Sequence, residues 1–307
     1  MSSLKEIKSR IASVRSTQKI TSAMRMVASA KLHHTQGMTE AFLRYKDELE
    51  KIVKTLSHNG EGDHLDGSLN DGGDVRQDKE GLKSILLIPV SSNSGLCGAF
   101  NSNIAKATMQ RIQELESQGK KVRLLPIGKK IAHELKKVGK DFHANFVELL
   151  DKIEKSNNFT DVSTLVEQAC EWQQNNEIDS VEFLYHHFKS MGSQVIQVDQ
   201  LNMSPNDNVD ENFQLSTFNF QPSSYLTEPS HEELLQSLFP RLQNAQVYGI
   251  LLDSLTSEHA ARMLAMQTAD DNANDLLKEL TLLYNKTRQQ AITNELIDIM
   301  SGKIGQN

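Results

Sequence analysis

The sequence has 307 residues, of which 38% are hydrophobic, and it carries a formal net charge of −7. That length gives room for a buried core in one large domain or two ordinary ones. No apolar run reaches the roughly 18 residues that cross a bilayer, the first residues lack the apolar core of a secretory signal, and Cys97 and Cys170 are far apart. We therefore expect a soluble protein of a reducing cytoplasm, with neither a disulfide framework nor a zinc cluster.

The first 56 residues are basic, although the chain as a whole is acidic. They carry eleven Lys and Arg against five Asp and Glu, a net charge of +6, and the remainder carries −13. Such a segment indicates either a polyanionic partner or a solvated helix face. Residues 4–56 contain no proline and one glycine, and their apolar residues recur at helical spacing, which predicts a single helix roughly 80 Å long. A helix of that length needs a second helix to cover its apolar stripe.

Residues 59–81 are rich in glycine and aspartate and predict a linker. After the linker, apolar runs alternate with helical patterns. The pattern predicts strands at 84–90, 122–128, 143–149, 181–188 and 193–201, the last two pairing as an edge hairpin, and helices at 103–116, 129–137 and 161–172, the last capped by Thr160 or Asp161. This alternation is typical of a mostly parallel, doubly wound sheet, so we expect a Rossmann-like α/β domain over residues 82–226.

Residues 230–304 predict a second long helix. Ser230 is the expected N-cap, with Glu233 completing a capping box, and Pro240 is the breaker that should matter most before Gly302. Two long amphipathic helices at opposite ends of a sequence pair naturally as an antiparallel coiled coil, here formed by residues 1–58 and 230–304. The predicted fold class is therefore α/β, with an antiparallel coiled coil of the terminal helices beside a Rossmann-like domain.

The turn at 91–103 is the segment of the sequence that most resembles an enzyme site, because a doubly wound fold often binds a phosphate there. However, no lysine follows Gly98 as a Walker loop requires, and Gly95 and Gly98 do not fit GxGxxG. The pattern favours a tight turn whose Asn and Ser residues cap the next helix. Because the sequence designates no histidine base for Cys97, we expect it to be a small buried residue.

The remaining candidates for chemistry are histidines and basic residues. His186 and His187 are adjacent on a predicted strand and should point to opposite faces, and His33 and His34 diverge on a helix. The basic charges of the first helix spread around it without interleaved aromatic residues, which argues against a nucleic-acid partner. We expect no catalytic residue, no metal site and no cofactor.

Segments at both ends and in the middle of the chain resemble the gamma subunit of F-type ATP synthases. They are residues 4–14 and 17–31, SGLCGAFNSN at 94–103, SEHAARMLAMQTADDNA at 257–273 and YNKTRQQAITNELIDIMSG at 284–302. The resemblance implies a central-stalk rotor subunit that is not itself an enzyme. Such a subunit couples ion flow through the membrane sector to conformational cycling of the beta-subunit sites for ATP synthesis.

The resemblance also implies partners and a location. The partners are the alpha and beta subunits of the catalytic ring, the epsilon subunit and the c-subunit ring of the membrane sector. The location is peripheral, on the cytoplasmic face of a bacterial inner membrane, and the family's pattern assigns contact residues, since an arginine fork can hold a carboxylate-bearing loop from one direction. The residues so implied are Arg288, Gln289, Thr293, Glu295, Met24, Arg25, Lys19 and Lys31 for the beta subunit, and Tyr225 and Glu228 for the c-ring.

Three features depart from the family's pattern. Ser91–Ser94 stand where the family often has Ser-Asp-Arg-Gly, the 57–81 segment is longer and more acidic than usual, and no cysteine pair forms the redox switch of the chloroplast subunit. The last feature favours a bacterial source. Two other interpretations stay open at this stage: a coiled-coil scaffold unrelated to the synthase, and an independent nucleotide-binding enzyme built on residues 82–226.

Overall fold

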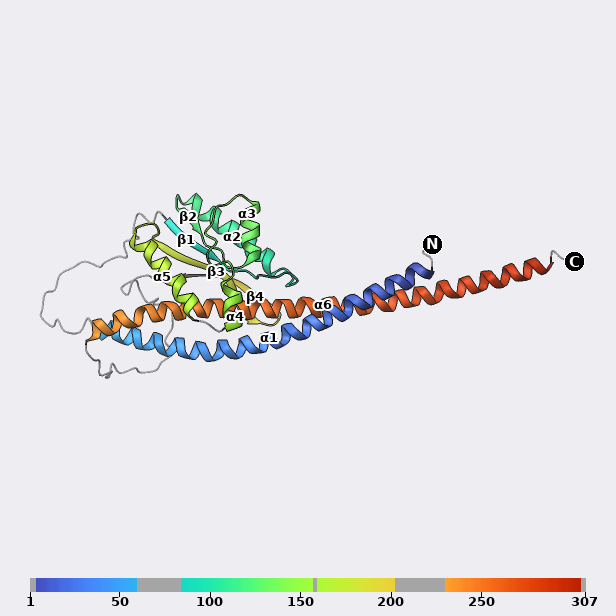
Figure 1. Cartoon of the computed structure of the whole chain (residues 1–307), viewed down its shortest axis with the longest axis horizontal. Coiled ribbons are helices and arrows are strands. Elements are labelled where there is room, and N and C mark those ends of the chain that lie inside the picture. Colours follow the sequence, from blue (N-terminus) through green and yellow to red (C-terminus); the bar gives the residue numbers. More distant parts are fainter. Residues whose placement is uncertain (1–3, 60–83, 157–158, 202–229, 305–307) are drawn as a thin grey trace, which may run out of the picture.

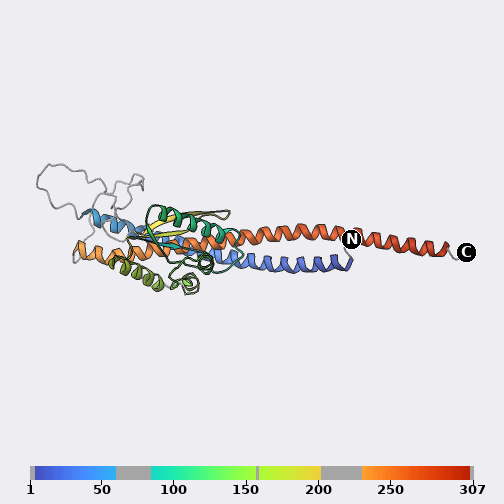
Figure 2. The ribbon, with the colours of Figure 1, turned by 90° about the horizontal axis from the view of Figure 1, so that it is seen from above.

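The chain forms two long antiparallel helices, here called the shaft, with a small α/β domain beside one end of them (Figure 1). The computed structural model describes residues 4–59, 84–156, 159–201 and 230–304. Helix α1 spans Leu4–Asn59 and helix α6 spans His231–Ile304. A view turned by 90° shows both helices continuing past the domain (Figure 2). The predicted fold class is confirmed.

Contacts across the shaft fix its antiparallel direction. Gln18 Nε2 donates to Asn274 Oδ1 at 2.6 Å, and the hydroxyl oxygens of Thr39 and Thr256 lie 3.3 Å apart. Apolar side chains line the face of α1 that packs on α6. The buried ones on α1 are Ile7, Ala28, Leu32, Leu49, Val53 and Leu56. Burying a leucine or isoleucine contributes about 1.5–3 kcal/mol, so packing, rather than helix propensity, holds the pair together.

Helix α6 begins as the sequence predicts. The backbone N–H of Glu233 donates to Ser230 Oγ at 3.2 Å, which satisfies one of the free donors of the first turn. Pro240, the residue expected to disturb the helix, lies inside α6 without ending it. Just beyond it, Leu242 is buried together with Leu49 of α1, so packing offsets the backbone hydrogen bond that a proline cannot donate.

In the described parts of the chain, four strands form a mostly parallel sheet in the order β2-β1-β3-β4. β1 is parallel to both β2 and β3, and β4 returns antiparallel to β3 as the predicted hairpin. The strands are β1 Ser84–Pro89, β2 Lys121–Leu124, β3 Ser180–Ser190 and β4 Ser193–Leu201. Every residue of β1 is buried, as expected for the inner strand of a sheet that is covered on both faces.

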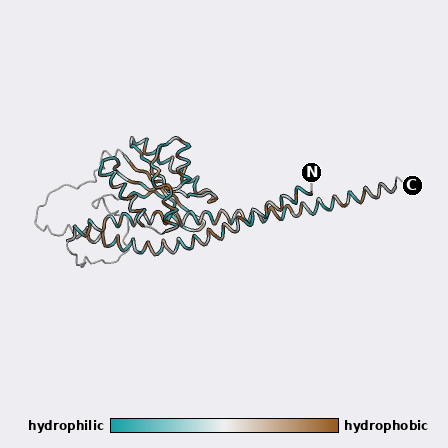
Figure 3. The backbone as a smooth tube through the Cα atoms, in the orientation of Figure 1, coloured by the Kyte–Doolittle hydropathy of each residue, from teal (hydrophilic) through white to brown (hydrophobic). Residues whose placement is uncertain are grey.

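Helices cover both faces of this sheet, and α6 is one of them. The shorter helices are α2 Phe100–Ser117, α3 Lys129–Lys137, α4 Leu149–Ser156 and α5 Thr160–Gln174. Leu87 packs in a cluster with Ile131 of α3, while its neighbour Leu86 belongs to the opposite cluster with Val247 and Leu251 of α6. Figure 3 shows hydrophobic residues gathered in the strands and recurring along both long helices. The shaft is therefore part of the core of the domain.

Residues 143–149 do not form the strand that their alternating pattern predicts. They make a turn that leads into α4, a helix that the sequence analysis did not predict. His143 N donates to Leu124 O at 2.9 Å, where a further strand would begin, but Val147 O accepts instead from Gly128 N at 2.9 Å. The backbone of this segment thus bonds to the loop before α3 rather than to a strand neighbour.

Two boundaries also differ from the prediction. Strand β2 ends at Leu124, short of 128, although Leu125 N still donates to Leu87 O at 3.1 Å and Ile127 N to Pro89 O at 3.0 Å. Helix α5 has Phe159 at its N-cap position without a side-chain hydrogen bond, so neither Thr160 nor Asp161 caps it.

His186 and His187 point to opposite faces of β3, as predicted. His187 Nδ1 lies 2.6 Å from Asp253 Oδ2, whereas His186 is 2% exposed and stacks on Phe100 with ring centroids 4.1 Å apart. Among the described residues, neither ring nitrogen of His186 has a hydrogen-bond partner. Burial lowers the pKa of His186 from 6.5 to about 4, because the protonated ring would be charged in an apolar environment.

This lowered pKa makes the domain acid-sensitive. Between pH 6.5 and pH 4 the unfolded chain binds a proton at His186 and the folded chain does not. The free energy of unfolding therefore has its full value above pH 6.5 and decreases by up to about 3 kcal/mol as the pH falls to 4. We expect His186→Leu to lose less stability over this range than the wild type. Urea unfolding at pH 7 and pH 4.5 measures the difference, and equal acid sensitivity in the two proteins would contradict the prediction.

Candidate partner-binding surfaces of the shaft

Helix α6 extends beyond the start of α1. Between the contact of Thr39 with Thr256 and the contact of Gln18 with Asn274, α1 covers 21 residues and α6 covers 18, so the two antiparallel helices advance at nearly the same rate. Continuing this pairing places Leu4 opposite about residue 288 of α6, so the last turns of α6 project past α1 by about 24 Å at 1.5 Å per residue. Figures 1 and 2 both show the C-terminal end of α6 beyond the N-terminus.

The projecting end of α6 exposes apolar side chains that have no cover within the described chain. The exposed ones are Ile292, Leu296, Ile297 and Met300, and Met300 has 67% of its surface exposed. A run of exposed apolar side chains of this size marks a contact surface. The structure therefore offers the end of α6 as a surface for partners.

The predicted contact residues of α6 all lie at this end. Arg288, Gln289, Thr293 and Glu295 are exposed. Thr293 Oγ1 donates to Gln289 O at 2.9 Å, so this hydroxyl proton is used within the helix. Arg288 and Glu295, with Ile292 between them, are spaced so that they share one face of the helix.

The predicted contact residues of α1 are placed differently. Lys19 is exposed and Met24 is half-buried, but Arg25 Nη1 donates to Gln267 Oε1 and lies 3.7 Å from Asp270 Oδ2 on α6. Lys31 Nζ forms an ion pair with Glu154 of α4 at 2.7 Å. Two of the four side chains therefore already have partners inside this chain.

A shallow groove runs beside Arg25 between α1 and α6. Its volume is about 430 Å³, and its lining includes Met26, Ser29, Met263 and Leu264. Met26 is 62% exposed. This groove adds apolar surface to the part of α1 where contacts were predicted. Tyr225 and Glu228, the two predicted c-ring contacts, lie outside the described residues.

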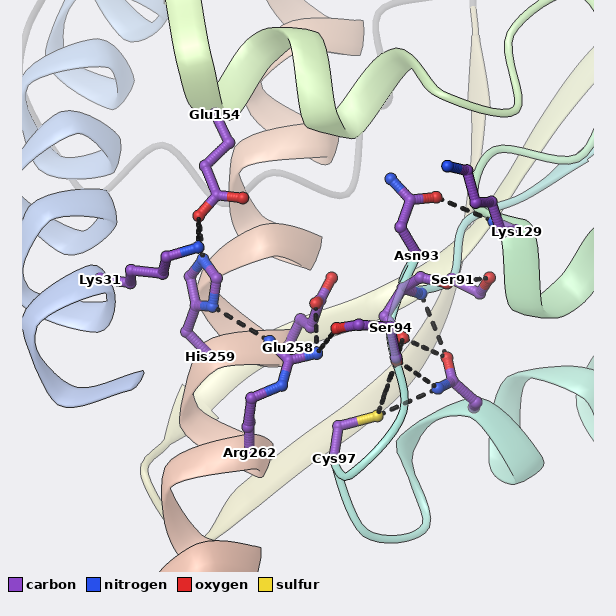
Figure 4. A network of polar contacts seen from close by, with 12 residues as sticks. Lys31, Ser91, Asn93, Ser94, Cys97, Lys129, Glu154, Glu258, His259 and Arg262 are labelled. Atoms are coloured by element: carbon purple, nitrogen blue, oxygen red, sulfur yellow. Dashed lines mark hydrogen bonds and ion pairs between the residues drawn. The ribbon is translucent and has the colours of Figure 1, made fainter. Parts of the chain in front are cut away.

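A polar network, here called the collar, joins both helices of the shaft to the domain (Figure 4). Its members come from α1, the loop after β1, α4 and α6, and they are Lys31, Ser94, Glu154, Glu258, His259 and Arg262. Arg262 Nη2 donates to Glu258 Oε1 and to Ser94 Oγ, both at 2.7 Å. His259 Nε2 lies 3.3 Å from Glu154 Oε1, the atom that Lys31 also contacts.

In both carboxyl groups of the collar, burial and neighbouring charges shift the pKa in opposite directions, and a different one of the two effects is larger in each group. The contact with His259, followed by the ammonium of Lys31, lowers the pKa of Glu154 from 4.5 to about 2, although burial opposes this. Burial raises the pKa of Glu258 above its usual value, and Arg262 opposes that shift. Glu154 is thus held as a carboxylate between two helices of the shaft.

The turn after β1 has its polar groups bonded mainly within the domain. Asn101 Oδ1 accepts from Ser92 N at 3.1 Å, and Asn101 Nδ2 donates to Cys97 Sγ at 3.0 Å. The tight turn is as predicted and Cys97 is buried, but the predicted Asn and Ser capping is wrong, since Ala99 occupies the N-cap of α2 without a side-chain bond. In the described part of the chain, no group of three or more His, Cys, Asp and Glu is placed to hold a metal ion.

Comparison with known protein families gives a match along almost the whole chain. A family profile described as ATP synthase matches residues 3–304. A relative named ATP synthase gamma chain from Parabacteroides distasonis is 47% identical over 303 residues, covering 98% of each chain. Another of the same name from Bacteroides thetaiotaomicron is 41% identical over 310 residues, covering 99% of this chain and all of the other.

Solved structures share the arrangement of shaft and domain. The rotor of the Euglena gracilis mitochondrial ATP synthase in rotational state 1 gives a TM-score of 0.64 at 19% identity, covering 94% of this chain and 98% of that one. A chain of the Tetrahymena thermophila mitochondrial ATP synthase central stalk and c-ring gives 0.52 at 25% identity, covering 81% and 99%. The likeness to the first structure concerns the fold, since the sequences differ at most positions.

Proposed function

We infer that the chain acts as the central-stalk rotor of an F-type ATP synthase, because it belongs to the family of ATP synthase gamma chains. In that role it couples ion flow through the membrane sector to the conformational cycling of the catalytic sites. The observation that carries the inference is the family match over residues 3–304, which takes in both long helices and the domain between them. The likeness in fold to the Euglena gracilis rotor and to the Tetrahymena thermophila central-stalk chain agrees with it.

We propose that the chain performs no bond chemistry itself. A rotor of this kind makes different contacts with each catalytic subunit as it turns, and those contacts shift the populations of the subunit's conformations. The shaft suits this task because it is not symmetric about its long axis (Figure 1). Helix α6 projects alone at the tip, and the domain lies on one side of the shaft at the base. As this asymmetric shaft turns, it presents a different surface to each partner subunit at each rotation angle.

The contact residues remain part of this proposal. We propose that Arg288, Gln289, Thr293 and Glu295 bind a loop of the beta subunit, supported by their exposure on the projecting end of α6. Lys19, Met24, Arg25 and Lys31 form the second beta-subunit surface, and the intrachain partners of Arg25 and Lys31 orient these two side chains rather than leave them free. Tyr225 and Glu228 would contact the c-ring.

The proposed assembly contains alpha, beta, epsilon and c subunits and lies at the cytoplasmic face of a bacterial inner membrane. In the described residues, no helix is long and apolar enough to cross a membrane. The chain would therefore be attached through the c-ring, as a peripheral member of the complex.

Reconstitution tests the proposed function. The chain is mixed with separately purified alpha and beta subunits of the same organism, and assembly is followed by size exclusion together with ATPase activity. We expect a stable complex whose ATPase depends on the added chain. A chain that elutes alone and leaves the activity unchanged would contradict the rotor function, and titration of the isolated chain with ATP would then test the nucleotide-binding alternative.

A further inference from the structure

The two helices of the shaft are attached to the domain in different ways. Val247 and Leu251 of α6 are fully buried in the core of the domain. Helix α1 lies on the outside of α6, and Phe42 is a partly buried residue that packs against that core. Nearer the free end, Lys31 ties α1 to Glu154 of the domain. Past this level both helices continue along each other beyond the domain (Figures 1 and 2).

Glu154 lies on a helix whose position is fixed by the core of the domain, so it can hold α1 in place. Its neighbour Ile153 is completely buried in the core of the domain, which fixes the position of α4. The Glu154 side chain is 24% exposed, and its Oε1 lies 2.7 Å from Lys31 Nζ of α1 and 3.3 Å from His259 Nε2 of α6, within ion-pair distance of both. Lys31 is 48% exposed, so salt screens part of its attraction to Glu154. One carboxylate therefore joins three separate elements at the base of the free shaft.

We propose that Glu154 is a positioning residue for torque transmission, which holds α1 at a fixed angle on α6 and the domain where the shaft leaves the domain. The proposal rests on the proposed rotor function. A rotor under load is driven at its base and resisted at its tip, so the shaft tends to twist between them. Helix α6 packs in the core of the domain, whereas α1 is held to α6 by the apolar seam and by polar contacts such as Gln18 with Asn274 and Arg25 with Gln267. The contact between Lys31 and Glu154 adds a direct tie from α1 to the domain, at the level where the load enters the free shaft.

The test uses the complete synthase in sealed membrane vesicles with Glu154→Gln, which keeps the shape of the side chain and removes its charge. Losing an ion pair whose lysine is half exposed raises the ratio of unlocked to locked shaft by up to about fivefold. We expect ATP hydrolysis without an opposing gradient to stay close to wild type, because little torque is then needed. ATP-driven ion transport and gradient-driven ATP synthesis should fall by up to the same factor, because both require torque to pass this joint and only the locked state transmits it.

Glu167→Gln is the matched control, because it makes the same change at an exposed position of α5 and should leave every rate unchanged. Thermal melting of the isolated chain and assembly of the complex check folding. If the glutamine variant fails to assemble, Glu154→Asp keeps the charge on a shorter arm and should show an intermediate loss of transport. A purely structural role would lower loaded and unloaded rates in the same proportion, and that result would overturn the proposal.

Two further outcomes separate a failure of the role of Glu154 from a failure of the rotor function. Normal transport in both the wild type and Glu154→Gln would overturn the role of Glu154 and leave the rotor function standing. A wild-type complex that hydrolyses ATP without any transport would overturn the rotor function, and the role of Glu154 with it.

Discussion

Replacing Gly128 with alanine is expected to destabilise the α/β domain by more than about 3 kcal/mol, or to prevent its folding. Gly128 has a φ of +105°, a conformation that side-chain-bearing residues rarely adopt. A Cβ atom built there would lie 2.1 Å from Ser91 O and 2.7 Å from Ser91 C. Both are backbone atoms, and the Ser91 backbone is itself held by a hydrogen bond from Ser91 N to Ile127 O at 2.8 Å. The clash therefore cannot be relieved by turning a flexible side chain.

Denaturant unfolding followed by the fluorescence of Trp172 measures this effect, because it is the single tryptophan of the chain and lies on α5, packed against the core. Gly119→Ala is the matched control. Gly119 also has a positive φ, +76°, but nothing lies within 4 Å of a Cβ built there, so its replacement should cost only about 1 kcal/mol. If both variants lost the same free energy of unfolding, the clash of the new Cβ atom with the Ser91 backbone would contribute nothing to the destabilisation.

Replacing Arg288 with alanine is expected to lower ATP turnover of the assembled complex by about tenfold to a hundredfold. The estimate follows from losing a hydrogen bond to a charged group, about 1.5–3 kcal/mol, if that bond forms only in some rotor orientations. Arg288 is exposed on the projecting end of α6, so the isolated chain should melt at an unchanged temperature. Turnover in the reconstituted complex and melting of the chain together measure both effects.

Lys286→Ala provides the control for Arg288. Lys286 is also exposed and cationic, and it lies two residues away on a different side of α6. Its replacement should change turnover little. An Arg288 variant with normal turnover, or a Lys286 variant with the same loss, would remove the specific contact assigned to Arg288.

The long helices could be predicted because their signal is local. An unbroken three-and-four spacing of apolar residues in residues 4–56 contains the information for a helix and for its buried face. Residues 143–149 show the limit of that reasoning. Their alternating pattern suits a strand, yet a strand needs a free neighbour in the sheet, and here Val147 O is taken by Gly128 N. The competing bond depends on a turn that lies about twenty residues away in the sequence.

Only part of the candidate site could be predicted from the sequence. Sequence resemblance located Arg288 at the end of the chain that turns out to project, but it gave no sign that Lys31 pairs with Glu154. Lys31, Glu154 and His259 come from three distant segments, and Glu154 lies on a helix that was not predicted. Pairings of this kind depend on the tertiary fold, and a single sequence carries no signal for them.

The burial of α6 within the domain determines the order in which the protein can fold as it is synthesised. One face of the sheet, at Leu86, is closed by Val247 and Leu251, and the apolar stripe of α1 is covered by the same helix. Helix α6 is the last element to leave the ribosome. Until then the sheet face and the first helix both remain open to water, so the nascent chain presents apolar surface, and with it a risk of aggregation, through most of its synthesis.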